Sequence, residues 1–214
     1  MPRRKVSNPL ALAVLGCLAE RPMHPYEMST TMRERGKHES IKLNYGSLYS
    51  VVEALQKHAL IAPRETVKDG RRPERTVYEI TPAGRLEFVD WLADLIGIPE
   101  KEYHSFEAGL SLVGGLDPDT VARLLDQRSA VLRAQLHSGV EMLRYAANLG
   151  VPRLFLIEGD YRRGQIEAEI EFVDKLAMSI RDGSLDGVDQ WREMHRRLAA
   201  GEEVAPFRLP TELS

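Results

Sequence analysis

Cysteine is almost absent from this sequence. Cys17 is the only one among 214 residues, so a single chain can form neither a disulfide framework nor a cysteine-based zinc site. A lone thiol within an apolar stretch is typical of a small buried side chain. The cysteine usage therefore excludes a disulfide-stapled secreted domain and favours the reducing cytoplasm as the location.

Long apolar runs and catalytic motifs are also missing. Hydrophobic residues make up 43% of the chain, but no run approaches the roughly 18 to 20 apolar residues of a membrane span. The six histidines show no pair at the i, i+4 spacing of a helical metal site. Glu167, Glu169 and Glu171 lack the Glu-x-x-His pairs of a di-metal bundle. We expect no enzyme activity, no metal and no cofactor, and no membrane as a partner.

Charge is distributed unevenly along the chain, whose formal net charge is −3. Residues 1–85 contain 15 Lys and Arg against 9 Asp and Glu, a balance of +6. Residues 86–214 contain 14 against 23, a balance of −9. A basic first part joined to an acidic second part indicates that only the first contacts a polyanion.

The first part of the chain shows three helical patterns in succession. Pro9 begins a helix that is apolar nearly all round, and Pro25 begins a second helix that Gly36 ends. Asn44 is a favoured N-cap for a third helix, whose apolar residues recur at inward spacing. These three helices are predicted to enclose a small core.

Two strands and a fourth helix follow. Residues 61–67 and 76–80 have the pattern of strands joined by the turn Asp69-Gly70, and Pro82 begins a helix that reaches Gly97. Three helices, two strands and a helix are the order of a winged helix. The sequence therefore predicts a mostly α protein, with an N-terminal winged helix-turn-helix at residues 1–97 built from three helices and a two-stranded wing.

Residues 98–214 predict a helical domain. Two helices of about 30 residues, each roughly 45 Å long, are joined by the turn at residues 150–152, and a shorter helix carries Trp191. Packed only on each other, the long helices would leave apolar surface exposed. We expect an antiparallel long-helix dimerisation domain with a second copy as partner. An intramolecular bundle covered by the helix at residues 188–199 is the alternative.

Residues suited to DNA contacts gather at two places in the first part. One is the start of the third helix, where an amide can pair with adenine and the helix N-terminus attracts phosphate. The other is the turn between the strands, where guanidinium groups can pair with phosphate oxygens. The predicted DNA-binding residues are Lys42, Asn44, Tyr45, Ser47, Tyr49, Arg71, Arg72 and Arg75.

Some of these side chains have a second interpretation. Asn44 is either a base-contacting residue or a helix cap only. Tyr49 either faces DNA or fills the core with its hydroxyl at the rim. Arg71 and Arg72 are alternatively part of a solvated loop. Trp91, on the fourth helix, either stacks on a planar effector or packs in the core.

Four stretches resemble the PadR family of bacterial transcriptional regulators. They are HPYEM at 24–28, GSLY at 46–49, a Leu-x-x-x-Gly-Leu-Ile element at 55–61, and GRRPERTVYEITPAG at 70–84. Pro25 and Ala59 both stand where the family more often has glycine. The resemblance covers residues 9–90, and the second part resembles the helical dimerisation domain of virulence-gene activators. It implies a homodimer on a palindromic operator, usually a repressor, and some members respond to phenolic acids or lipophilic drugs.

Taken together, these patterns predict a sequence-specific, DNA-binding transcriptional regulator. Its expected partners are double-stranded DNA and a second copy, and we expect a homodimeric repressor relieved by a small planar or lipophilic effector. A protein-interaction module that uses the winged helix for docking, without DNA binding, is the alternative. The charge of Arg71 and Arg72 argues against it, because docking does not require that charge.

Overall fold

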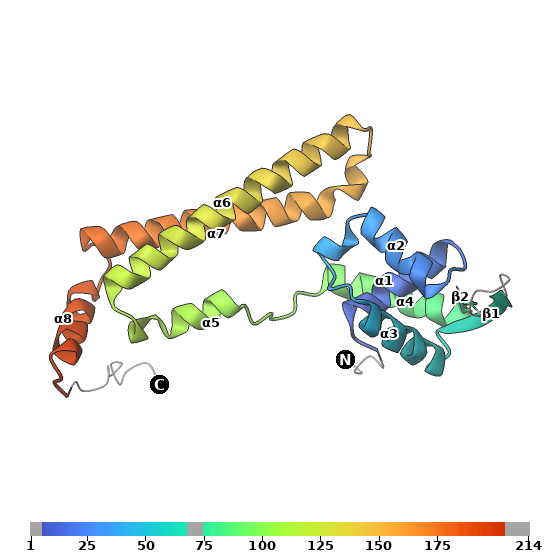
Figure 1. Cartoon of the computed structure of the whole chain (residues 1–214), viewed down its shortest axis with the longest axis horizontal. Helices are drawn as coiled ribbons and strands as arrows, with labels where there is room; N and C mark the ends of the chain where they lie inside the picture. Colours follow the sequence, from blue (N-terminus) through green and yellow to red (C-terminus); the bar gives the residue numbers. More distant parts are fainter. Residues whose placement is uncertain (1–5, 68–74, 204–214) are drawn as a thin grey trace. The chain divides into compact units, whose positions relative to one another are not determined.

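The computed structural model describes residues 6–67 and 75–203, and it is mostly helical (Figure 1). The described residues form a two-stranded antiparallel sheet. The chain divides into two compact units, Met1–Lys101 and Glu102–Ser214. The predicted mostly α class with a winged helix is confirmed.

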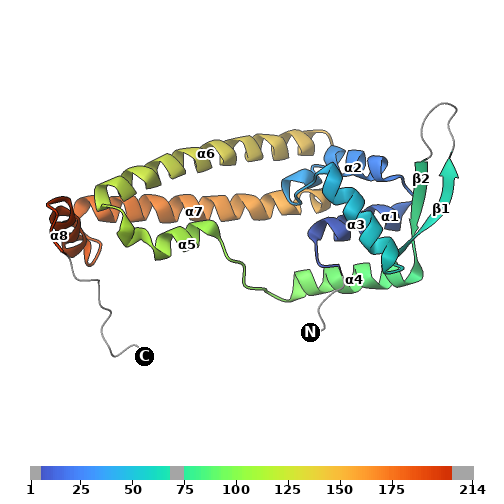
Figure 2. The same ribbon diagram turned by 60° about the horizontal axis from the view of Figure 1, so that its bottom comes forward.

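The first unit has the helix and strand order of a winged helix. Its elements are α1 (Pro9–Glu20), α2 (Pro25–Glu34), the short 3₁₀ helix η1 (Lys37–Glu39), α3 (Tyr45–Lys57), β1 (Ile61–Val67), β2 (Arg75–Ile80) and α4 (Pro82–Gly97). Figure 2 shows the β1–β2 hairpin projecting beyond the helices of this unit. The hairpin is therefore the wing, and α3 is the helix that precedes it.

Polar caps determine where the first two helices begin. The Asn8 side chain accepts a hydrogen bond from the Leu10 N–H at 2.9 Å. Glu27 of α2 accepts one from the His24 N–H at 3.0 Å and completes a capping box. Each cap satisfies a backbone donor that the first helical turn leaves without a partner.

The core of the first unit combines residues from all four α-helices and both strands. Leu10, Leu15, Leu18, Met23, Met28, Leu48, Leu55 and Ile61 are its largest side chains that are almost fully enclosed. Cys17 lies within this core, and burial raises the pKa of its thiol. The expectation of a small buried hydrophobic side chain at this position is confirmed.

The sheet is anchored to the helices by a third backbone segment. β1 and β2 pair from Ile61 opposite Ile80 outwards, with a register shift between Pro63 and Glu65. Met23 and Tyr78 exchange two backbone hydrogen bonds of 3.0 Å each. This bridge ties β2 to the segment between α1 and α2, and so fixes the base of the wing.

The end of α3 requires a left-handed residue, and alanine occupies that position. Ala59 has φ 57°. Its N–H donates to the Gln56 carbonyl at 2.9 Å, and the Leu60 N–H donates to the Leu55 carbonyl at 3.0 Å. This pair of bonds is a Schellman motif, in which glycine normally fills the left-handed position.

Replacing Ala59 with glycine is expected to raise the free energy of unfolding by about 1 kcal/mol, because a Cβ is unfavourable in the left-handed region. Chemical denaturation monitored by circular dichroism measures the change. The control is Ala93→Gly on the exposed side of α4, which should lower stability by about 1 kcal/mol. Equal losses in both variants would contradict the assignment.

α4 begins in close contact with the end of α3. The Thr81 hydroxyl accepts from the Gly84 N–H at 3.0 Å and lies 2.8 Å from the Ala59 carbonyl oxygen, to which it donates. The Thr81 N–H donates to the Leu60 carbonyl at 3.0 Å. A Cβ added at Gly84 would lie 2.0 Å from that same Leu60 oxygen. Glycine is therefore required where α4 meets the backbone after α3.

The second unit is a pair of long helices with shorter helices beside them. Its elements are α5 (Ser105–Ser111), η2 (Val113–Gly115), α6 (Pro118–Asn148), η3 (Arg153–Phe155), α7 (Ile157–Asp182) and α8 (Val188–Ala199). α6 and α7 lie side by side and run antiparallel (Figures 1 and 2). With 31 and 26 residues, they are the two long helices that the sequence predicts.

Buried apolar residues and charged pairs hold α6 against α7. The core comprises Val121, Ala122, Leu125, Leu132, Ile170, Val173, Ala177, Ile180 and Val188. Arg128 and Arg133 of α6 reach Glu169 and Asp174 of α7, each at 2.5 Å. A hydrogen bond with the buried Ser129 hydroxyl holds the pKa of Asp174 below its ordinary value, and the hydrogen bond with Arg133 lowers it further. These contacts fix the register of the antiparallel pair.

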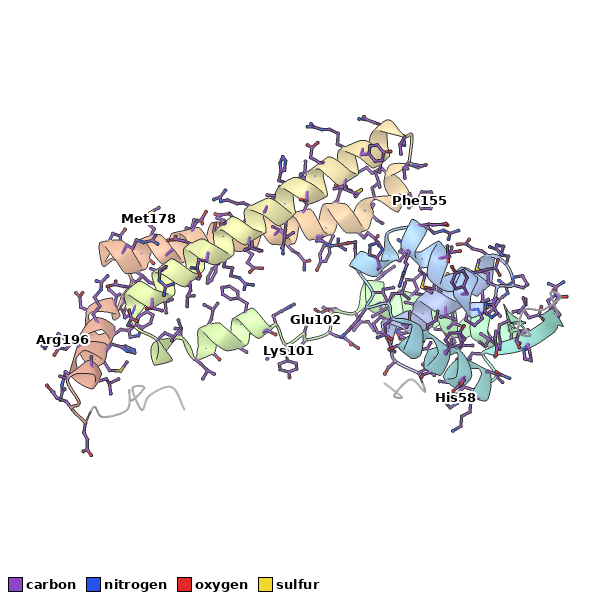
Figure 3. All side chains as sticks on the ribbon, viewed as in Figure 1. His58, Lys101, Glu102, Phe155, Met178 and Arg196 are labelled. Carbon is purple, nitrogen blue, oxygen red and sulfur yellow. The ribbon has the colours of Figure 1, made fainter. Side chains whose placement is uncertain are left out.

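α8 covers one end of the pair. The Trp191 indole N–H donates to the Leu116 carbonyl at 2.9 Å, and the His195 Nε2 lies 2.9 Å from the Gly114 carbonyl oxygen. Both contacts join α8 to the segment that precedes α6. At the opposite end, around the α6–α7 turn, large apolar residues stay exposed, among them Phe155 (Figure 3). The alternative considered in the sequence analysis was that the helix at residues 188–199 covers the pair within one chain. In the structure this helix, α8, covers only one end of the pair.

Candidate DNA interface

α3 presents a polar face to solvent because its opposite face is fully used in the core. Leu48, Val51, Val52 and Leu55 are buried. The exposed residues of the helix are Gly46, Tyr49, Ser50, Glu53, Gln56 and Lys57. A helix anchored in this way can place a polar face against a groove without losing any core contact.

Asn44 caps α3. Its Oδ1 accepts a hydrogen bond from the Ser47 N–H at 2.7 Å. The cap was one of the two interpretations of this residue, and the structure shows it. The amide of Asn44 also carries an NH₂ group, which is a donor. A base contact by that group stays a prediction.

A hollow of about 300 Å³ lies where the first turns of α1 and α3 come together. Its lining residues are Asn8, Pro9, Ser40, Ile41, Lys42, Asn44 and Ser47. Lys42 is exposed, and Ser47 is half-buried. The fold thus brings three of the predicted DNA-binding residues, Lys42, Asn44 and Ser47, to one place, together with the first turn of a helix that the sequence had not linked to them.

The structure describes the side chain of only one of the two tyrosines of α3. Tyr45 begins the helix, and its side chain lies outside the described residues. Tyr49 is 45% exposed, so its ring is on the surface and does not fill the core. The Ser50 hydroxyl beside it donates to the Gly46 carbonyl at 3.1 Å. Tyr49 and Ser50 together give the first half of α3 an uncharged, hydrogen-bonding surface.

Several cations of the first unit are held within the fold. Arg35, which follows the last residue of α2, makes two hydrogen bonds to Glu20 of α1, one of them 2.8 Å long. The Arg35 guanidinium lowers the pKa of Glu20, and Glu20 raises that of Arg35. Arg21 lies 3.3 Å from Glu27, and Arg85 donates to a backbone carbonyl of α1. These arginines join helices, and they leave Lys42 and Lys57 as exposed cations beside α3.

The arginines of the wing are described only in part. Arg71 and Arg72 lie outside the described residues, in the segment between β1 and β2. Arg75 is the first residue of β2 and pairs with Val67, and its side chain is likewise outside the described residues. Arg64 of β1, which the sequence analysis did not select, is exposed and lies 3.9 Å from Glu79. Contacts of the wing arginines with DNA stay predictions.

Trp91 lies in the core of the first unit and is 5% exposed. The structure thus has the core-packing arrangement, and the indole ring has no open face on which a planar effector could stack. Trp91 follows Gly84 and Phe88 at the spacing of one helix face. That face of α4 is the one directed into the unit.

The sequence analysis did not select Ser50 and Glu53, which lie on the exposed face of α3. The signal was present, because the inward spacing of Leu48, Val51 and Leu55 leaves positions 50 and 53 facing outward. The predicted residues of this helix end at Tyr49, and those that follow along the chain are arginines of the wing, so neither Ser50 nor Glu53 is among them.

The described residues contain no cluster of three or more His, Cys, Asp or Glu side chains arranged to hold a metal ion. Across the same residues, no helix combines the length and the apolar character of a membrane span.

The order of its helices and strands defines the first unit as a winged helix-turn-helix. A family model described as "Transcriptional regulator PadR-like family" matches residues 14–90, which span α1 from Val14, the helix α3, the wing and most of α4. Residues 14–90 are therefore similar to the PadR-like family of transcriptional regulators. No curated protein matches the chain.

Solved structures extend the likeness in fold over both units. Bacillus subtilis PadR in complex with operator DNA is 19% identical, with a TM-score of 0.63, and the alignment covers 81% of this chain and 98% of that one. The Vibrio cholerae virulence activator AphA is 17% identical, with a TM-score of 0.61 and the same coverage. Bacillus subtilis PadR in complex with p-coumaric acid is 17% identical, with a TM-score of 0.53, and the coverage is 77% and 98%.

Proposed function

We propose that the chain is a homodimeric repressor that binds a palindromic operator through α3 and the wing. The observation that carries this proposal is α3 itself. Its apolar side is consumed by the core, while Asn44, Ser47 and Tyr49 lie at its capped N-terminal end beside Lys42. Polar side chains at the start of such a helix read base edges, and a cation beside it binds the backbone.

Exposed apolar surface in the second unit supports the homodimer. Large side chains more than half exposed gather on both sides of the α6–α7 turn, and they are Met142, Tyr145, Leu149, Leu154, Phe155, Ile157 and Tyr161. A surface of this kind on a soluble chain marks an interaction site. A second copy would cover it symmetrically and place two winged helices on one operator, with half-sites about 34–36 Å apart for one turn of DNA.

The exposed side of α4 supports the same arrangement. Leu86, Val89 and Ile96 are between 61% and 79% exposed, although their spacing would also suit a core. The face of α4 that packs inward is the one with Phe88 and Trp91. The helix therefore has a second apolar face that a partner can bury.

An effector extends the proposal. We infer that a small planar or lipophilic molecule relieves repression, because a structure of similar fold contains p-coumaric acid. Since Trp91 is buried in this chain, we do not assign the effector to the ring of Trp91.

Gel shift with the duplex upstream of the chain's own coding sequence tests the proposal. We expect a discrete complex at nanomolar protein, unaffected by excess unrelated duplex and lost on addition of millimolar p-coumaric acid. If the complex persists in the presence of the acid, p-coumaric acid is not the effector, and the proposed repressor function is unaffected. Equal competition by every duplex would contradict sequence-specific binding and favour a docking module.

A further inference from the structure

Glu53 occupies the middle of the exposed face of α3. The side chain is exposed, and it makes no hydrogen bond or ion pair with any other residue in the described ranges. It lies one helical turn beyond Tyr49 and one turn before Lys57. Glu53 is thus the carboxylate on the exposed face of α3, and the proposed function directs this face toward DNA.

We propose that Glu53 determines base specificity by accepting a hydrogen bond from the N4 amino group of a cytosine in the major groove. This inference rests on the proposed function, since it requires α3 to enter the groove. It goes beyond that function because it names the residue and the base that it reads.

Glu53 neither caps α3 nor forms an ion pair with any described residue. α3 is capped at its start by Asn44, and Glu53 lies in the second half of the helix, away from the N-terminus that stabilises negative charge. Against a phosphate backbone an unpaired carboxylate is repelled. Base edges are the part of the groove that provides donors to it.

The chemistry of the groove selects cytosine. A carboxylate accepts hydrogen bonds but cannot donate them. The major groove presents two amino groups, N4 of cytosine and N6 of adenine. The adenine amino group lies beside N7, an acceptor that repels a carboxylate, whereas cytosine has no acceptor at that edge. Glu53 therefore favours a C·G pair at one position in each half-site.

Selection of bound duplexes from a random pool tests this assignment, using the full chain and three variants. Wild type should enrich an operator with an invariant C·G pair in each half-site. Glu53→Ala should reduce the preference for that pair about tenfold, the effect of roughly 1.4 kcal/mol at one base contact. Glu53→Gln should shift the preference at that position toward adenine, which an amide can pair bidentately.

Asp90→Ala is the matched control, because it removes one exposed carboxylate from α4 of the same unit. It should leave the selected sequence unchanged, and circular dichroism should show native folding in all variants. If Glu53→Ala keeps the wild-type base preference at every position, the assignment is overturned, even if the variant binds all duplexes more tightly. A loss of preference at all positions would overturn it too. Failure of the wild type to enrich any sequence would instead remove the proposed function, and this inference with it.

Discussion

Replacing Gly84 with alanine is expected to lower the free energy of unfolding of the first unit by about 2–3 kcal/mol. The added Cβ would lie 2.0 Å from the Leu60 carbonyl oxygen and 2.9 Å from the Ile80 side chain. The Leu60 oxygen belongs to backbone that is already bonded to Thr81, so it cannot move aside without breaking that contact. Overpacking of this kind typically destabilises by about 1–3 kcal/mol.

Thermal unfolding followed by circular dichroism measures the effect, and Tm should fall by about 10–20 °C at roughly 4–8 °C per kcal/mol. Gly97→Ala provides the control on the same helix, because no atom lies within 4 Å of a Cβ at that position. It should keep or slightly raise Tm. If Gly84→Ala has the same Tm as Gly97→Ala, the close approach of α4 to the Leu60 backbone is wrong.

The double replacement Arg71→Ala and Arg72→Ala is expected to weaken operator binding by about 10–100-fold. If each guanidinium neutralises one phosphate, the slope of log K against log salt should fall in magnitude by about two. Fluorescence anisotropy of a labelled operator, measured over a salt series, gives both quantities. Both arginines lie in the segment between β1 and β2.

The control for charge alone is Arg196→Ala with Arg197→Ala. It removes two cations from α8 (Figure 3), where they contact Glu193 and Glu202. Affinity and salt slope should stay near the wild-type values. A wing variant that behaves like this control would show that the turn between the strands does not contact DNA.

The helices of this protein were predictable because their signals are local. Pro9, Pro25 and Pro82 each begin a helix in the structure, and Asn44 caps α3 as its side-chain type suggested. Spacing of apolar residues assigned the inward face of α3 correctly, because that helix has a single apolar face.

The face of α4 that packs inward was not predictable from spacing. Leu86, Val89 and Ile96 form one apolar stripe, and Phe88 with Trp91 forms part of another. Periodicity alone cannot decide which stripe packs within the chain. The structure buries Trp91, since the glycine that permits close approach, Gly84, lies on the same face as that residue.

The pairing of cations in the candidate site was also hidden from the sequence. Arg35 and Glu20 are 15 positions apart, and their contact depends on how α2 packs on α1. The count of positive charge over residues 1–85 therefore included arginines that form ion pairs within the fold. Glu53 was not among the predicted residues because they were chosen at the start of α3 and at the wing, and Glu53 lies in the second half of that helix.

The mass of the complex in solution tests the central claim most directly. Size exclusion with light scattering should give twice the mass of one chain for the free protein, and two chains on one duplex for the complex with the selected operator. A chain that stays monomeric both free and on the duplex, or that elutes without DNA at low salt, would contradict the account.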